Sequence, residues 1–223
     1  MNVSEAITSR ITTRAFLDKP VPGEVLREIL EAAKRAPSGG NLQPWHVWVL
    51  GGEEMVRFKA LIKEKMPSQP RGEGTEYQIY PPDLKEPYKA RRFKCGEDMY
   101  ATINVPREDK FGRLMNFARN FEFFGAPAAF FFAIDRTMQE GQWADLGMFM
   151  QSIMLLAREH GLHTCPQEAW AIWHKTLGEF LSIPPELMLF CGMGIGTMDE
   201  THPINALRTE RAPLDEFVTF VGV

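Results

Sequence analysis

The sequence predicts an α+β fold in which helices pack on a small sheet, and three observations support this class. Several segments repeat apolar residues at the spacing of an amphipathic helix. Residues 46–50 (HVWVL) and 128–135 (AAFFFAID) are apolar runs typical of buried strands. The helices and strands do not follow the regular β-α-β order of a parallel sheet. With 223 residues, 44% of them hydrophobic, the chain can bury one sizeable core, and we expect a single domain over residues 1–223.

The N-terminal part of the chain begins with a short predicted helix at residues 3–10. An amphipathic helix follows at 22–35, with Pro22 at its start and Pro37 ending it. The strand at 46–50 leads into a charged helix near 53–65. Residues 66–111 differ from these segments, because they are rich in Pro, Gly, Tyr and charge and show little periodicity. A long excursion of this kind is more often functional or mobile than part of a core.

The C-terminal half holds the strongest helix signal, at residues 143–160, where the apolar stripe is so wide that we expect burial nearly all round. A helix at 112–125 and the strand at 128–135 precede it, and Gly161 ends it. The segment HTCPQEAW, a helix near 171–181 and a strand at 187–196 follow. The tail PLDEFVTFV, at 213–221, is a candidate for a late strand.

Charge and composition exclude several classes of function. The net charge of −4 argues against a nucleic-acid binder, which usually carries a basic surface. The three cysteines form no CxxC pair and the five histidines show no ligand spacing, so we expect reduced thiols and no metal. No apolar run reaches about 18 residues and the N-terminus lacks a signal core. These features predict a cytoplasmic protein without a membrane partner.

Residues 191–196 (CGMGIG) contain two glycines that begin a dinucleotide-binding motif, but the pattern is incomplete. Position 197 is Thr, no helix follows, and the chain has no room for a second β-α-β half. A strand packed closely on a neighbouring helix is the preferred interpretation.

Two pairs of arginines lie near opposite ends of the chain. Arg10 and Arg14 flank two threonines, and Arg208 and Arg211 are three residues apart. Guanidinium groups bind phosphate oxygens in a bidentate manner, so the four side chains would suit a phosphate held between the two chain ends. Each pair taken alone also fits a solvated surface, and the sequence leaves open whether the pairs meet.

The loop APSGGNLQPW, at residues 36–45, offers accessible backbone N–H groups at Ser38, Gly39 and Gly40 and side-chain amides at Asn41 and Gln43. An amide both donates and accepts hydrogen bonds, which suits a flat heterocycle with mixed edges. A simple helix-stop turn would explain the Gly and Pro residues, although not the two amides before a buried strand.

Taken in order, these motifs resemble a known family. SRITTRAF (9–16), APSGGNLQPWHVWVL (36–50), FGAP (124–127), DLGMFMQSIMLLAREHGL (145–162) and the segment from Asn205 to Phe217 are similar to motifs of the FMN-dependent nitroreductases. The resemblance covers nearly the whole chain and is weakest at 66–111. It implies a nitroreductase-like fold, with a small mixed, mainly antiparallel sheet sandwiched by helices. It also implies a homodimer that exchanges its C-terminal strands and holds two FMN molecules at its interface.

The resemblance assigns a role to each motif. Arg10, Arg14, Arg208 and Arg211 would hold the FMN phosphate, with Ile11 and Thr12 beside it. The loop would use Pro37, Ser38, Gly39 and Asn41 to contact a flavin ring that is bound mainly by the partner chain. Backbone of the PQEA segment would lie over the ring near flavin N5, at Pro166, Gln167, Glu168 and Ala169. The family often has Ser where this chain has Gly39 and Gly40, and Arg119, Asn120 and Glu122 compete for one further polar contact.

The function implied is an NAD(P)H oxidoreductase that reduces nitroaromatic or quinone acceptors by ping-pong hydride transfer, with no protein nucleophile. The choice between NADH and NADPH stays open. We expect residues 66–111 to form an aromatic, partly basic lid over the flavin, or otherwise a solvated excursion. Candidate contacts with a small aromatic acceptor are Tyr88, Arg92, Phe123 and Phe124. The alternatives are a reductive dehalogenase of the iodotyrosine deiodinase kind or a flavin-destroying synthase on the same scaffold, and a non-enzymatic flavin-binding protein.

Overall fold

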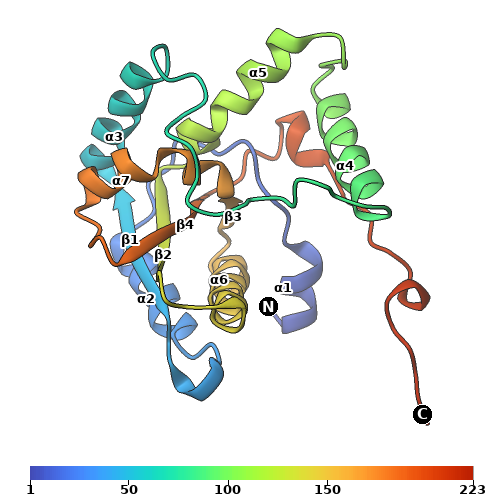
Figure 1. Ribbon diagram of the computed structural model, residues 1–223. Helices are drawn as coiled ribbons and strands as arrows, with labels where there is room; N and C mark the ends of the chain where they lie inside the picture. Colours follow the sequence, from blue (N-terminus) through green and yellow to red (C-terminus); the bar gives the residue numbers. More distant parts are fainter. Residues whose placement is uncertain (223) are drawn as a thin grey trace.

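The computed structural model describes residues 1–222 and is built on a four-stranded sheet with the strand order β1-β2-β4-β3 (Figure 1). The strands are β1 (Trp45–Gly51), β2 (Ala128–Asp135), β3 (His163–Gln167) and β4 (Leu187–Gly196). All three pairings between them are antiparallel, and one isolated parallel bridge joins Thr12 to Thr164. The α+β class and the three strands predicted from apolar runs are therefore confirmed. The fourth strand lies within HTCPQEAW, whose polar composition concealed it.

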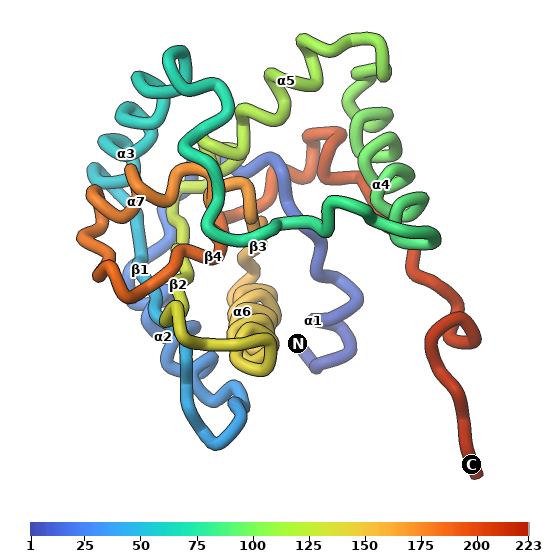
Figure 2. The backbone as a smooth tube through the Cα atoms, in the orientation of Figure 1, coloured from blue at the N-terminus to red at the C-terminus, as the bar shows by residue number. Residues whose placement is uncertain are grey.

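Helices cover both faces of the sheet (Figures 1 and 2). Helices α2 (Gly23–Ala33) and α6 (Glu140–Glu159) pack on one face, while α3 (Gly52–Lys65) and α7 (His174–Leu181) pack on the other. Strand β2 serves both layers, since Phe130 and Phe132 enter the first and Phe131 the second. Burial on both faces explains why its sequence shows no polar alternation.

Helix α1 (Val3–Ser9) begins with a capping box, in which Asn2 and Glu5 each satisfy a backbone N–H of the other. Helix α6 is less buried than its sequence suggested. Its inner face includes Leu146 and Ile153, which are fully buried, but Met148 on the other side is 41% exposed. Burial all round was therefore wrong for the single chain.

The excursion at 66–111 contains a helix that the sequence did not reveal, α4 (Tyr88–Thr102). No residue of α4 is buried, so the helix lacks the apolar periodicity on which prediction depends. The predicted helix at 112–125 is α5 (Lys110–Ala118) followed by 3₁₀ turns at Arg119–Gly125. Phe123 and Phe124 adopt left-handed backbone angles there, and this irregular turn places both rings in the core.

The C-terminal tail forms no strand within the described residues. Residues Leu214–Glu216 make a 3₁₀ turn, and the chain to residue 222 then runs away from the body of the protein (Figure 1). The strand predicted at 213–221 is corrected for the single chain. A strand requires a neighbour for its backbone hydrogen bonds, and no edge of this sheet lies beside the tail.

Candidate cofactor and substrate site

Both pairs of arginines line one hollow of about 770 Å³. Arg10 and Arg14 come from the segment after α1, while Arg208 and Arg211 come from the segment after β4. The hollow is completed by Cys95 of α4, by Gln151 of α6 and by neighbours of the arginines. These neighbours are Ile7, Thr8, Ile11, Thr12, Leu207, Thr209 and Glu210. The structure thus brings the two arginine pairs together, whereas the sequence had left open whether they meet.

A single buried side chain, Asn205, joins the two chain ends. Its Oδ1 accepts a hydrogen bond from the backbone N–H of Arg14 at 2.8 Å, and its Nδ2 donates to the carbonyls of Ala15 and Asp199, both at 2.8 Å. Asn205 is only 3% exposed. A buried amide with all these bonds made fixes the relative position of both segments. In the sequence Asn205 was only the first residue of the C-terminal motif and had no assigned role, because nothing local distinguishes it from a surface Asn.

On the other side, the backbone of the N-terminal segment is tied to the sheet. The N–H of Thr13 donates to the carbonyl of Thr164 at 3.0 Å, beside the bridge between Thr12 and Thr164. Strand β3 therefore carries the arginine segment on its outer edge. The residues that directly follow along β3, from Pro166 onward, line a second hollow.

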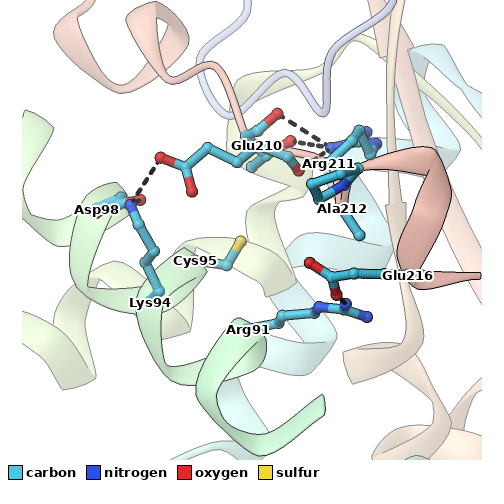
Figure 3. Close-up of a pocket in the computed structure, with 10 residues that line it drawn as sticks. Arg91, Lys94, Cys95, Asp98, Glu210, Arg211, Ala212 and Glu216 are labelled. Atoms are coloured by element: carbon cyan, nitrogen blue, oxygen red, sulfur yellow. Dashed lines mark hydrogen bonds and ion pairs between the residues drawn. The ribbon is translucent and has the colours of Figure 1, made fainter. Parts of the chain in front are cut away.

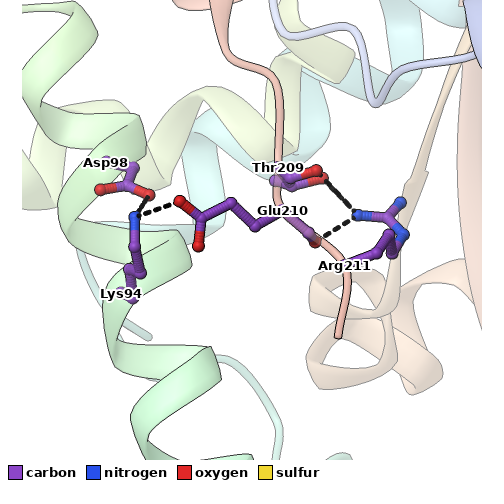
Figure 4. Close-up of polar contacts among 5 residues, drawn as sticks. All are labelled: Lys94, Asp98, Thr209, Glu210 and Arg211. Atoms are coloured by element: carbon purple, nitrogen blue, oxygen red, sulfur yellow. Dashed lines mark hydrogen bonds and ion pairs between the residues drawn. The ribbon is translucent and has the colours of Figure 1, made fainter. Parts of the chain in front are cut away.

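The basic hollow contains unbalanced positive charge. Burial, followed by the charge of Arg211, lowers the pKa of Arg10. Arg211 Nη1 donates to the carbonyl and hydroxyl of Thr209 and to the carbonyl of Glu210 (Figure 4). Within residues 1–222, no carboxylate forms an ion pair with any of the four arginines. Such a cluster is suited to binding an anion.

The one acidic side chain in this hollow, Glu210, is turned toward α4. Its carboxylate pairs with Lys94 at 3.3 Å, and Lys94 also pairs with Asp98 at 2.6 Å (Figures 3 and 4). Arg91 pairs with Glu216 one turn earlier on α4. These contacts hold α4 against the C-terminal segment and leave the arginines without a carboxylate partner.

The second hollow encloses about 600 Å³ and is mostly apolar. All four residues of the PQEA segment line it, together with Ile79 and Tyr80 of the excursion, Phe117 of α5 and Asn120 of the following 3₁₀ turn. Its remaining wall is formed by Gly147, Met150, Met154, Ile172, Phe190 and Cys191. Helix α6 is shared by both hollows, because Gln151 lines the basic one and Met150 the apolar one.

Polar groups at the PQEA segment are incompletely paired. Gln167 is 3% exposed, and its Nε2 donates to the carbonyl of Asn120 at 2.7 Å and to Asn120 Oδ1 at 3.2 Å. Its Oε1 has no partner among the described residues. Glu168 is half-buried, and burial raises the pKa of its carboxyl. A ligand with polar edges could satisfy groups of this kind.

The loop at residues 37–41 lines neither hollow. The backbone N–H of Gly39 donates to Asp145 Oδ2 on α6 at 3.1 Å, and the hydroxyl of Ser38 accepts from the N–H of Gln43 at 3.0 Å. Pro37, Gly39 and Asn41 are exposed. The structure therefore does not bring this loop together with the arginines of the same chain.

The four predicted acceptor contacts fall in different places. Phe123 and Phe124 are 0% and 4% exposed and belong to the core, so their expected position in a pocket wall is corrected. Tyr88 is 60% exposed and lines neither hollow. The Arg92 guanidinium lies 4.0 Å from the centre of the Tyr80 ring, which does line the apolar hollow.

Residues 1–222 carry neither a cluster of metal ligands nor a membrane-spanning helix. No group of three or more His, Cys, Asp or Glu side chains there could hold a metal ion. None of the helices in residues 1–222 combines the length and apolar character needed to span a bilayer.

The fold and its paired hollows define an α+β protein with a basic subsite for an anion beside an apolar slot. The model of the nitroreductase family matches residues 7–197, and the chain belongs to this family. The chain is 37% identical over 219 residues to a chloronitrobenzene nitroreductase of Comamonas testosteroni, covering 98% of this chain and 96% of that protein. It is 36% identical to a nitrobenzene nitroreductase of Ectopseudomonas oleovorans, with the same shares covered.

Solved structures agree with this assignment. The FMN and NADPH-dependent nitroreductase NfnB from Sphigopyxis sp. strain HMH superposes with a TM-score of 0.96 at 42% identity, over 100% of both chains. The FMN-dependent NfnB from Mycobacterium smegmatis, in complex with NADPH, gives 0.92 at 26% identity, over 98% of this chain and 97% of that one. The nitroreductase fold predicted from the resemblance is confirmed.

Proposed function

We propose that the protein is an FMN-dependent NAD(P)H oxidoreductase that reduces nitroaromatic acceptors. The observation that carries this function is the basic hollow, in which four arginines have no carboxylate partner among residues 1–222, next to an apolar slot lined by the PQEA segment. FMN joins a phosphate to a flat ring and would use both subsites. Relatives named as nitroreductases over nearly their full length support the reaction, and they do not favour the dehalogenase or the non-enzymatic alternative.

The residues fit this cofactor by their chemistry. Arg10, Arg14, Arg208 and Arg211 would bind the phosphate, and an anion there would offset the burial and the repulsion from Arg211 that lower the pKa of Arg10. Ile11 and Thr12 line the same hollow and would lie beside the ribityl chain. The segment from Pro166 to Ala169 would lie against the ring. When bound, FMN supplies the hydride chemistry between NAD(P)H and the acceptor.

Among the three candidates for a further polar contact, Asn120 is favoured. It lines the apolar hollow and is fixed there by Gln167. Arg119 instead lies over the ring of Phe124, with its guanidinium 5.6 Å from the ring centre, and Glu122 is exposed. We assign Asn120 to the flavin edge.

The working unit in this proposal is a homodimer. Large apolar side chains of the tail are exposed in the single chain, and they are Leu214, Phe217, Phe220 and Val221. Surfaces of this kind usually mark an interface. In the dimer the tail would pack on the partner, and Pro37, Ser38, Gly39 and Asn41 would contact the ring bound mainly by the other chain. A single domain over residues 1–223 would form each subunit, and cytoplasmic location belongs to the same proposal.

The excursion at 66–111 would act as a lid over the acceptor. Ile79 and Tyr80 already line the apolar hollow, and Arg92 lies against Tyr80. Tyr88 would approach an acceptor only if α4 moved toward the slot. The lid would favour flat aromatic acceptors, including those with a negative group near Arg92.

The test is anaerobic reduction of the purified protein by NADH and by NADPH, followed by mixing with a nitroaromatic, a quinone and a halophenol. We expect bound FMN to bleach with at least one nucleotide and to be reoxidised by the nitroaromatic. A protein that cannot be reconstituted with FMN would contradict the flavin function, and a yellow protein that NAD(P)H does not bleach would support binding alone. Light scattering of the same sample measures whether it is dimeric.

A further inference from the structure

The apolar hollow contains one carboxyl group, that of Glu168, and the surroundings of this group differ from those of other acidic side chains. Glu168 lies directly after β3, at the start of the 3₁₀ turn Glu168–Trp173, and is half-buried. No hydrogen bond or ion pair of its carboxylate is present among residues 1–222, whereas the other partly buried glutamates, Glu73 and Glu97, are both paired. A carboxyl that is half-buried without a partner favours its protonated form.

Glu168 lines the hollow beside Cys191 of the neighbouring strand, because Gln167 pairs with Gly192. Burial raises the pKa of Tyr77 and of Cys191, and the charge of Glu168 is a smaller contribution in the same direction. Cys191 itself lines the hollow from β4. Glu168 therefore belongs to the wall that β3 and β4 form together, and the hollow beside this wall is the slot in which an acceptor would bind.

The other titratable groups around the slot are poorly placed to give up a proton. The Tyr77 hydroxyl is engaged with the carbonyl of Phe190 at 2.6 Å, and the buried Cys191 thiol contacts the carbonyl of Gly192. Tyr80 is half-exposed, with the Arg92 guanidinium over its ring. The walls from α6 and α5 contribute Met150, Met154 and Phe117, which are apolar.

We propose that Glu168 is the general acid that donates a proton to an oxygen of the bound nitro group as that group is reduced. The proposal rests on the proposed function, since it concerns the same slot. Reduction of a nitro group to a nitroso group and water consumes two electrons and two protons. The hydride equivalent that originates in NAD(P)H carries both electrons and one proton. Glu168 supplies the second proton, one N–O bond breaks, the oxygen leaves as water, and the carboxylate regains a proton from solvent.

The isosteric, uncharged variant Glu168→Gln tests the proposal. The two half-reactions are measured separately, without oxygen, by stopped-flow spectroscopy. Reduction of the flavin by NAD(P)H should be unchanged, because it needs no proton from the protein. Reoxidation by a nitroaromatic should slow about 100-fold and lose its dependence on pH, in the range by which general acids contribute. Reoxidation by ferricyanide, which accepts electrons without protons, should keep the wild-type rate. The exposed Glu179→Gln, on α7, is the matched control and should behave as wild type in all three reactions.

A second readout is independent of turnover. Infrared difference spectra of the wild-type protein and Glu168→Gln should isolate a protonated carboxyl band that titrates above the usual glutamate range. The absence of this band at every pH where the protein is folded would contradict the proposal. Equal slowing of the nitroaromatic and ferricyanide reactions would show a structural role and overturn it, and so would an unchanged nitroaromatic rate. Loss of the nitroaromatic reaction in Tyr80→Phe, with Glu168→Gln unaffected, would transfer the role to Tyr80 and reject Glu168.

Failure of the proposed function would look different. In that case NAD(P)H would not bleach the wild-type protein, and no reoxidation could be followed with any variant.

Discussion

Gly192 of β4 lies directly against the indole of Trp170, so that a Cβ at position 192 would be 2.3 Å from Trp170 Cδ1. Trp170 is fully buried and its ring stacks on Phe123 with centroids 4.5 Å apart. The glycines of CGMGIG therefore allow close packing, as the sequence interpretation preferred. Gly192→Ala should lower the free energy of unfolding by about 1–3 kcal/mol, because the added methyl group must displace a buried ring.

Urea unfolding measures this change, and Gly178→Ala is its control. Gly178 lies in α7 with no atom near its missing Cβ, so alanine there should leave stability equal or raise it by up to about 1 kcal/mol. Equal effects of the two substitutions would show that the contact with Trp170 does not restrict position 192.

Removing arginines from the basic hollow should weaken FMN binding. Arg10→Ala and Arg14→Ala should each cost about 1.5–3 kcal/mol, roughly a 10- to 150-fold rise in Kd, because each loses a charge-assisted hydrogen bond. Fluorescence quenching of FMN on binding to apoprotein measures the constant. Arg57→Ala is the control, since Arg57 is exposed on α3 and pairs only with Glu54. An unchanged Kd for both hollow variants would place the phosphate elsewhere.

By pairing with the carboxylate of Glu210, Lys94 should keep that carboxylate away from the arginines of the basic hollow. In Lys94→Gln the carboxylate of Glu210 is released and can pair with a neighbouring arginine, so FMN affinity should fall about 5-fold, in keeping with the modest energy of exposed ion pairs. The double variant Lys94→Gln/Glu210→Gln should recover the wild-type affinity. If the double variant were as weak as the single one, Lys94 would act through α4 and not through Glu210.

Acid should destabilise the protein partly through His163. Burial, and then the charge of Arg158, lowers the pKa of His163 from 6.5 to about 4 in the folded state. The unfolded chain binds a proton near pH 6.5, so this contribution to stability is complete above that pH and is lost as the pH falls toward 4. Allowing for solvent screening, His163 contributes about 1–2 kcal/mol to the free energy of unfolding at neutral pH.

Urea unfolding of His163→Gln at pH 7.5 and 4.5 checks this prediction. The difference in unfolding free energy between the two pH values should be smaller than in the wild-type protein. The exposed His160→Gln should keep the wild-type difference. A His163→Gln variant with the full wild-type pH dependence would assign the acid sensitivity to other groups.

Local pattern explains which parts of the fold could be predicted. The runs at 128–135 and 187–196 were found because burial on two faces requires apolar residues throughout. Helix α4 was missed because it buries no residue and is held by Arg91 and Lys94 on the C-terminal segment. The tail was predicted as a candidate strand, yet its own residues do not provide the neighbouring strand that backbone pairing requires.

Some residues of the candidate site could likewise be predicted from local pattern, and others could not. The arginines and the PQEA segment were recognised from motifs, and all of them line one of the two hollows. Phe123 and Phe124 could not be assigned from composition, because a phenylalanine in a pocket wall and one in a core look alike in sequence. Their left-handed backbone angles turn both rings inward, which only the folded chain reveals.

By itself the sequence determined the α+β class, the positions of three strands and most helices, and the chemical types available to bind an anion and a flat ring. Those properties follow from periodicity and residue type, which are local. The tertiary structure alone decided that Arg14 and Arg211 share one hollow, because Asn205 bonds to the backbone of Arg14 across 191 positions of the sequence. It also decided that Glu168, which has no partner in the described part of the chain, lines an apolar slot. Contacts between distant segments depend on how the whole chain packs, and no local pattern encodes them.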